Sequence, residues 1–542
     1  MSERWFEALS VCVDELKSLG MHAWLSDASI GAASACVDGM VGGHPEYRAR
    51  HLRVQSLRVN GGVTYQVRLP DHGSSLVCIQ AVRISAQSAE EGGRLEFMDE
   101  PRDLTEHYQE GRLRWEAPTG YWFVAVFWEC PTGETTGSGN ACHLDVMDRE
   151  AVSAYLQHAC KPYERFQTDF GGTIKGMLTG GLPVMPHDAA YDAVAINADG
   201  RQPLRKLPGV SLPWTRDMLS KFRELKGYDL HPRLMQLLWD IAPDTQQVRS
   251  DYYSVISTLY CDAYHGQLAD WCREHGLEYV GGTADDALWH RICTQGDQMA
   301  VQACFDRPGF GHQDHAPVPE RIVAARLTTS PAHLGGVKRV ACTVSSGSGH
   351  GATLAELRTS LNFTCALGCS TIMPHAFHYS MAGCRKTDSP PTGFYHNSYW
   401  PWYSHFADYA ARQCLVQGTG SHVCDTLVLL PTETAQVDTW HEGELCAEPP
   451  CRRLLTWLSD ELLRLQCDYD YVSDSRLQAA VVRDGRLTFP DSEVAYSLLI
   501  LPGCRVMSVH AARKLLEWRR AGGCLVILGE PPSQALERGQ DE

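Results

Sequence analysis

One stretch constrains the fold of this chain more than any other, and it lies between residues 339 and 380. Its parts are a β-prone run at 340–344, a Ser/Gly loop at 345–351, a helix-like segment at 354–367 and a short apolar run at 370–373. This order predicts one strand–helix–strand unit of a parallel α/β sheet. Active sites in such folds lie at the carboxyl ends of the strands. The two segments that follow the strands are therefore candidate site segments.

The rest of the chain shows two further patterns. Its 542 residues exceed one ordinary core, so several domains are expected. From about residue 53 to 145 apolar residues recur with a period of two, which predicts an antiparallel β insertion. Near the C-terminal end, apolar runs at 498–501 and 524–528 flank a helical pattern, which is typical of a small doubly wound α/β domain.

Composition excludes several kinds of partner. The net charge of −17 argues against a nucleic-acid or anionic-membrane partner, because both need a basic face. No run approaches the ~18–20 apolar residues of a membrane helix. The 21 cysteines show no paired spacing and no apolar signal region precedes them, which favours a reducing cytoplasm. We expect a cytoplasmic protein that acts on a small-molecule substrate.

Several phrases occur in an order that resembles one family. They are Met21-His22-Ala23-Trp24-Leu25-Ser26-Asp27, His44-Pro45-Glu46-Tyr47-Arg48, Gly227-Tyr228-Asp229-Leu230 and Pro374-His375-Ala376-Phe377-His378-Tyr379-Ser380. Over nearly the whole chain they resemble glycoside hydrolase TIM barrels of the α-L-rhamnosidase-like group, which is related to β-galactosidase-like barrels. The resemblance implies a TIM-like (β/α)8 barrel and an amidotransferase-like C-terminal domain. The family has at least one further strand and helix ahead of the Asp27 strand, so we expect a barrel that is open, truncated at its start or completed in another way. The implied segments are 1–52 and 146–440 for the barrel, 53–145 for the β insertion and 441–542 for the C-terminal domain.

The chain departs from the family pattern where that pattern is acidic. Glycosidases of this type use two carboxylates, one as acid and one as nucleophile or base. The family's acidic phrases read here as Asp27-Ala28, Thr179-Gly180-Gly181-Leu182-Pro183 and Ser345-Ser346, while Asp286 stands where a Glu is usual. These changes predict a pseudo-glycosidase that performs a non-hydrolytic acid–base step on a small, partly apolar or glycosylated metabolite in a biosynthetic pathway.

Two alternatives remain open. The first is an active glycosidase with Asp286 as the acid and Asp27 as the nucleophile or base. The second is a non-catalytic binding or assembly subunit, whose barrel is completed by a homo-oligomer or a partner chain.

The candidate catalytic residues are His375, Tyr379, Asp286 and Asp27, which the resemblance places after strands. Histidine titrates near neutral pH, and tyrosine can donate a hydrogen bond or a proton. The expected substrate-binding residues are Trp214, His350, Ser346, His378, Arg385, Tyr395 and Trp400. Each has an ordinary structural alternative, because an Asp can cap a helix and an aromatic ring can fill a core.

No cofactor and no metal site is predicted. The loop Gly347-Ser348-Gly349-His350-Gly351 lacks the dinucleotide-binding spacing. His312, Asp314 and His315 offer two imidazoles and a carboxylate on a Pro/Gly loop, without the positioned set and supporting contacts that a metal site needs.

Overall fold

The computed structural model of the chain describes residues 2–27, 40–69, 74–89, 94–131, 143–184, 210–282, 288–313, 316–346, 348–386, 392–441, 444–445 and 449–537. Asp286, one of the predicted site residues, lies outside these ranges. The side chains of Ser346 and Arg385 also lie outside the description, although their backbone belongs to described elements.

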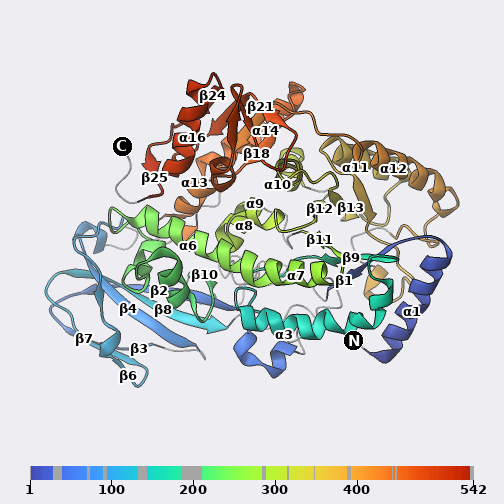
Figure 1. Cartoon of the computed structure of the whole chain (residues 1–542). Coiled ribbons are helices and arrows are strands. Elements are labelled where there is room, and N and C mark those ends of the chain that lie inside the picture. Colours follow the sequence, from blue (N-terminus) through green and yellow to red (C-terminus); the bar gives the residue numbers. More distant parts are fainter. Residues whose placement is uncertain are drawn as a thin grey trace.

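A parallel sheet of six strands forms the centre of the molecule (Figure 1). Its spatial order is β1 (Ala23–Ser26), β9 (Ile174–Thr179), β11 (Glu278–Gly281), β12 (Arg307–Gln313), β13 (Ala341–Ser346) and β14 (Thr371–Pro374). Each strand pairs in parallel with the next one along this order, so all six carboxyl ends lie at one edge. Within the described ranges β1 and β14 pair on one side only, so the sheet is an open half-barrel with six of the expected eight strands.

One long helical run packs beside this sheet and changes its pitch midway. It consists of α6 (Thr245–Tyr260), a π-helical turn at Cys261–Gly266 and α7 (Gln267–Glu274). The sequence predicts a single helix over 251–275, so the observed run begins six residues earlier and contains a wide turn that the apolar pattern does not reveal. Because π turns re-aim the side chains that they carry, they are frequent at functional sites.

The predicted β insertion contains antiparallel strands, and one more strand joins them from outside it. The larger sheet has the order β10 (Val210–Trp214), β2 (Arg50–Asn60), β8 (Tyr121–Pro131), β4 (Ser75–Ile84) and β5 (Arg102–Asp103), and the smaller one has β3 (Thr64–Arg68), β7 (Arg112–Glu116) and β6 (Tyr108–Gln109). The sequence predicts a loop as far as residue 212, so β10 is a correction. Pro213, which has no N–H, is tolerated because β10 is an edge strand.

The C-terminal part is a four-stranded parallel sheet with the order β18 (Asp470–Val472), β15 (Thr426–Leu429), β22 (Leu498–Pro502) and β24 (Cys524–Leu528). Helices α14 (Pro450–Arg464) and α16 (Val509–Arg520) belong to this part. The strand order reverses at β15, as in a doubly wound sheet. Its likeness to amidotransferase domains stays a prediction.

Helix α10 (Val318–Leu334) joins the two parallel sheets. It contacts β12 of the half-barrel on one side and α14 and β18 of the C-terminal part on the other. Its residues are buried around most of its circumference, as expected for a helix between two apolar layers. One hydrophobic cluster therefore extends from Val340 and Cys342 in the half-barrel to Leu427 and Leu499 in the C-terminal sheet.

The remaining helices are shorter or peripheral. They are α1 (Glu3–Ser18), α3 (Arg149–Ala159), α5 (Met218–Lys226), α8 (Leu288–Gln295), α9 (Gln298–Gln302), α11 (Leu354–Ala366), α12 (Tyr403–Gln417), α13 (Thr432–Val437) and α15 (Asp474–Gln478). Among the helices described, none has the length and apolar character needed to cross a membrane. The cytoplasmic location stays a prediction.

Candidate active site at the carboxyl ends of the strands

Asp27 lies directly after β1, and its side chain is fully buried, with 0% exposed. Its backbone N–H donates to the carbonyl oxygen of Leu178 in β9 at 3.1 Å, which continues the parallel pairing. The Tyr264 hydroxyl donates to Oδ2 of Asp27 at 3.3 Å and lies 3.2 Å from Oγ1 of Thr179, the last residue of β9. The ends of β1 and β9 and the π turn therefore meet at one carboxylate.

Buried tyrosines surround this carboxylate. Tyr155, Tyr260, Tyr264 and Tyr279 each have at most 1% of their surface exposed. Burial raises the pKa of Tyr264 and of Tyr155 well above the ordinary value, and the nearby Asp27 carboxylate raises both further. Because these phenols stay protonated, they can act as hydrogen-bond donors toward a negative charge.

The π turn also positions His265 beside this group. His265 is fully buried, and its Nδ1 lies 2.9 Å from the hydroxyl of Tyr279 in β11. Burial lowers the pKa of His265 to about 3, so the imidazole is neutral at physiological pH. The turn thus directs two consecutive polar rings, Tyr264 and His265, toward the sheet.

The ends of β9 and β11 are closely packed. The Thr179 hydroxyl accepts a hydrogen bond from the N–H of Gly181 at 3.1 Å, so it closes the turn after β9. A Cβ atom at Gly281 would lie 2.1 Å from the carbonyl oxygen of Thr179, and one at Gly282 would lie 2.1 Å from that of Gly309. Only glycine fits at these two positions. Asp286 follows four residues after Gly282 in the sequence, and its role stays a prediction.

At the ends of β13 and β14 the structure brings two of the predicted histidines together. The ring centroids of His350 and His378 are 6.4 Å apart. Nδ1 of His350 accepts a hydrogen bond from the N–H of Thr392 at 3.3 Å. His378 is half-buried, whereas His375 and Tyr379 are exposed, Tyr379 to 85%.

Next to these histidines lies a group of exposed aromatic rings. Trp400 packs edge-on against Phe394 and Phe377, with ring centroids 5.1 and 6.3 Å apart. Tyr395 and Trp400 are 53% and 37% exposed, so both present ring surface to solvent. The hydroxyl of Tyr395 donates to the carbonyl oxygen of Tyr379 at 2.8 Å, which holds this surface against the segment after β14.

Trp214 lies elsewhere. It belongs to β10, is only 2% exposed, and its indole N–H donates to Oε2 of Glu129 at 3.2 Å. Its ring is part of the hydrophobic core around the insertion sheet. This is the position of a packing residue, so the expectation that Trp214 stacks on a substrate is corrected: stacking requires an exposed ring face.

Sequence reasoning missed the tyrosines around Asp27. The only available signal was the spacing of Tyr260 and Tyr264, four residues apart within a long helical pattern, which puts both rings on one face. Nothing in the local pattern showed that this face meets Asp27.

The comparisons with known proteins agree with this architecture. A rhamnosidase from Novosphingobium sp. PP1Y matches 89% of this chain and 51% of its own, with a TM-score of 0.56 and 19% identity. A catalytic mutant of a GH42 beta-galactosidase from G. stearothermophilus matches 96% of this chain and 63% of its own, with a TM-score of 0.55 and 11% identity. At these identities the likeness shows a shared fold.

One curated relative and one family profile extend the comparison. A protein named putative beta-glucuronidase from Formosa agariphila is 22% identical over an alignment of 454 residues that covers 80% of this chain and 34% of that protein. The chain thus spans between a third and two thirds of the length of these relatives. The profile of the family Glyco_hydro_106, described as alpha-L-rhamnosidase, matches residues 208–542. The chain belongs to this alpha-L-rhamnosidase family of glycoside hydrolases.

Proposed function

We propose that the chain is a glycosidase that hydrolyses a terminal sugar at the carboxyl ends of the half-barrel strands, with Asp27 as nucleophile or base. The observation that carries the proposal is the buried Asp27 carboxylate at the end of β1, which accepts a hydrogen bond from Tyr264. A carboxylate held by a neutral donor at this edge of an α/β sheet is suited to stabilise or attack a developing positive charge on a sugar ring.

The strand order supplies a place for the second carboxylate. β1 and β11 are both neighbours of β9, so their ends are two strand spacings apart, about 10 Å between backbones. The two carboxylates of a glycosidase are ~5–9.5 Å apart. Two side chains that follow β1 and β11 can come this close if they project toward each other. Asp285 and Asp286 follow β11 in the sequence, and we assign Asp286 as the general acid.

We infer that the substrate class is an α-L-rhamnoside. The description of the family supports this inference. The exposed rings of Tyr395 and Trp400 support it independently, because rhamnose carries a methyl group and aromatic faces favour apolar sugar surfaces. The name of the Formosa relative makes a β-glucuronide the second substrate to test.

A non-hydrolytic enzyme on the same scaffold is the second candidate. It is favoured by the other strand ends, where Gly180, Gly181 and Ser346 stand in place of the family's carboxylates. In that case the histidines after β14 would supply acid–base groups without a paired carboxylate.

Turnover of aryl glycosides separates the two candidates. The glycosidase proposal predicts release of the aryl group from an α-L-rhamnoside, and Asp27→Asn or Asp286→Asn should each lower kcat/KM by ~10²-fold or more. Asp270→Asn, at an exposed position in α7, is the control and should keep wild-type activity. A folded wild-type chain that hydrolyses none of the aryl glycosides would support the non-hydrolytic candidate.

A further inference from the structure

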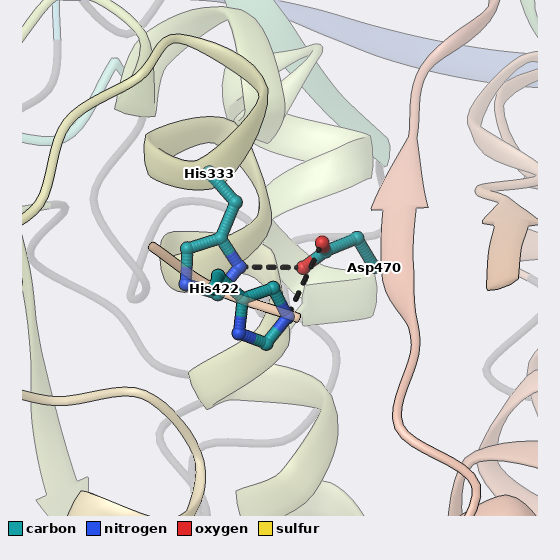
Figure 2. Close-up of side chains that lie close together, drawn as sticks. All are labelled: His333, His422 and Asp470. Carbon is teal, nitrogen blue, oxygen red and sulfur yellow. Dashed lines mark hydrogen bonds and ion pairs between the residues drawn. The ribbon is translucent and has the colours of Figure 1, made fainter. Parts of the chain in front are cut away.

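Two histidines and one aspartate converge between the half-barrel and the C-terminal sheet, away from the strand ends described above (Figure 2). His333 lies in the last turn of α10, His422 in the segment between α12 and β15, and Asp470 is the first residue of β18. Nδ1 of His333 is 2.8 Å from Oδ1 of Asp470, and Nε2 of His422 is 3.6 Å from Oδ2. One nitrogen or oxygen atom from each of the three residues lies within 4.8 Å of the others.

A hydrogen bond from outside the trio fixes the carboxylate of Asp470. Asp470 is fully buried, and the hydroxyl of Tyr496 donates to its Oδ2 at 2.8 Å. Such a contact fixes the orientation of a carboxylate, as the outer contacts of metal ligands do. Asp468, whose Oδ2 is 3.8 Å from Nε2 of His422, lies beside the trio and pairs with the buried guanidinium of Arg326.

A pocket gives access to the histidines. It has a volume of about 310 Å³, and both His333 and His422 line it together with Ser421 and Glu493. The His333 side chain is 10% exposed and that of His422 is 19% exposed. Nε2 of His422 is buried and makes no hydrogen bond among the described residues, and its contacts with Asp470 and Asp468, at 3.6 and 3.8 Å, are longer than hydrogen bonds, so this nitrogen is available as a ligand.

We propose that His333, His422 and Asp470 bind a divalent transition-metal ion of the Zn²⁺ class. Two imidazoles and one carboxylate form a ligand set that such ions prefer, with a water molecule from the pocket in the fourth position. The two rings are now stacked, with centroids 3.8 Å apart, so binding requires them to turn until both nitrogens point at the ion. His422 lies outside the regular elements, where a ring can turn without moving a helix or strand.

The position of the trio indicates what the ion does. Its ligands come from the helix that joins the two sheets, from the segment entering the C-terminal sheet and from a strand of that sheet. An ion bound to all three cross-links the half-barrel to the C-terminal part. Because a metal that binds only the folded chain stabilises it by mass action, unfolding should require a higher temperature when the ion is present.

The test is titration of the full-length, chelator-treated chain with Zn²⁺ by calorimetry and with Co²⁺ by visible absorption. We expect one ion bound per chain. Co²⁺ should give the visible absorption of a tetrahedral site with nitrogen and oxygen ligands, without the thiolate bands that cysteine ligands would give, and Zn²⁺ should raise the Tm. His422→Ala and His333→Ala should each weaken binding by more than about tenfold, and Tyr496→Phe by ~10–100-fold through the loss of its contact to Asp470.

His510→Ala is the matched control, because His510 is an exposed histidine of α16 that is remote in sequence from the trio, and it should bind as the wild type does. A wild-type chain that binds neither ion, or His422→Ala and Tyr496→Phe variants that fold and bind as tightly as the wild type, would overturn the proposal. Thiolate-type Co²⁺ absorption that persists in His422→Ala would do the same, because it would assign binding to cysteines.

Discussion

Two buried carboxylates in this chain differ in what balances their charge. Asp27 lies among protonated tyrosines and accepts from Tyr264, whereas Asp145 accepts from the Thr215 hydroxyl at 2.7 Å and the Met147 N–H at 3.1 Å. Burial raises the pKa of Asp145 to about 7, and these hydrogen bonds offset the shift only in part. Asp145 is therefore a group through which the stability of the fold depends on pH.

We predict that Asp145→Asn stabilises the chain at high pH. The folded pKa is above the unfolded one, so the folded state binds the extra proton, and stability from this group falls as pH rises from about 4 to about 7. An uncharged asparagine can still accept from the Met147 N–H through Oδ1, while its amide Nδ2 donates to the Thr215 hydroxyl oxygen in place of accepting from it. Relative to wild type, the variant's free energy of unfolding should rise by up to about 4 kcal/mol, at ~1.4 kcal/mol per pKa unit.

Urea unfolding at pH 5 and pH 8 measures this difference. The gain of Asp145→Asn over wild type should be larger at pH 8 than at pH 5, while the exposed Asp270→Asn variant should show no such change. An equal difference at the two pH values would mean that Asp145 titrates normally.

At the scale of elements, the π turn at Cys261–Gly266 connects the helix layer to the candidate site. It carries Tyr264, which reaches Asp27 across 237 positions of sequence, and His265, which contacts Tyr279. The π turn contains one residue more than a regular α-helical turn. In a regular α-helix the side chains of Tyr264 and His265 would therefore point in a different direction around the helix axis. The turn is therefore the element that brings a helix residue to the end of β1.

Deletion of Asp262, an exposed residue of the π turn, tests this role. Removing one residue lets the run continue as α-helix, so helical circular dichroism should be retained while Tyr264 loses its contact. The free energy of unfolding should fall at least as far as in Tyr264→Phe, about 1–3 kcal/mol for a lost hydrogen bond to a buried charge. Tyr395→Phe removes a hydroxyl from an exposed tyrosine and is the control. A deletion variant as stable as wild type would contradict this account.

Part of this structure could be predicted from sequence, because some of its signals are local. The pattern at 339–380 predicted β13, α11 and β14, since apolar runs bounded by Ser and Gly specify strands and the segment at 354–367 has a helical pattern. In the structure a capping box of Thr353 and Glu356 begins α11. The contact of Asp27 with Tyr264 could not be predicted, because it depends on how distant elements pack. The prediction that Trp214 stacks on a substrate was wrong for the same reason. Its burial depends on β10, an edge strand that forms by pairing with β2.

At the scale of the whole molecule, the half-barrel and the C-terminal sheet share a core through α10. We predict that they unfold together in one calorimetric transition. Leu455→Ala, at a fully buried position in α14, should lower the free energy of unfolding by about 2–5 kcal/mol and move the whole transition to lower temperature. Leu465→Ala, just after the same helix and 69% exposed, should change little. A separate low-temperature transition in Leu455→Ala would show that the two parts unfold independently.

We propose that this member of the alpha-L-rhamnosidase family hydrolyses glycosides with Asp27 as nucleophile or base. The most direct measurement is the kcat/KM of the wild-type chain and of Asp27→Asn on an aryl α-L-rhamnoside, with a thermal melt to verify that the variant is folded. We predict measurable release by the wild type and a fall of ~10²-fold or more in a folded Asp27→Asn variant. Equal turnover by the two proteins, or no turnover by a folded wild type, would contradict the account.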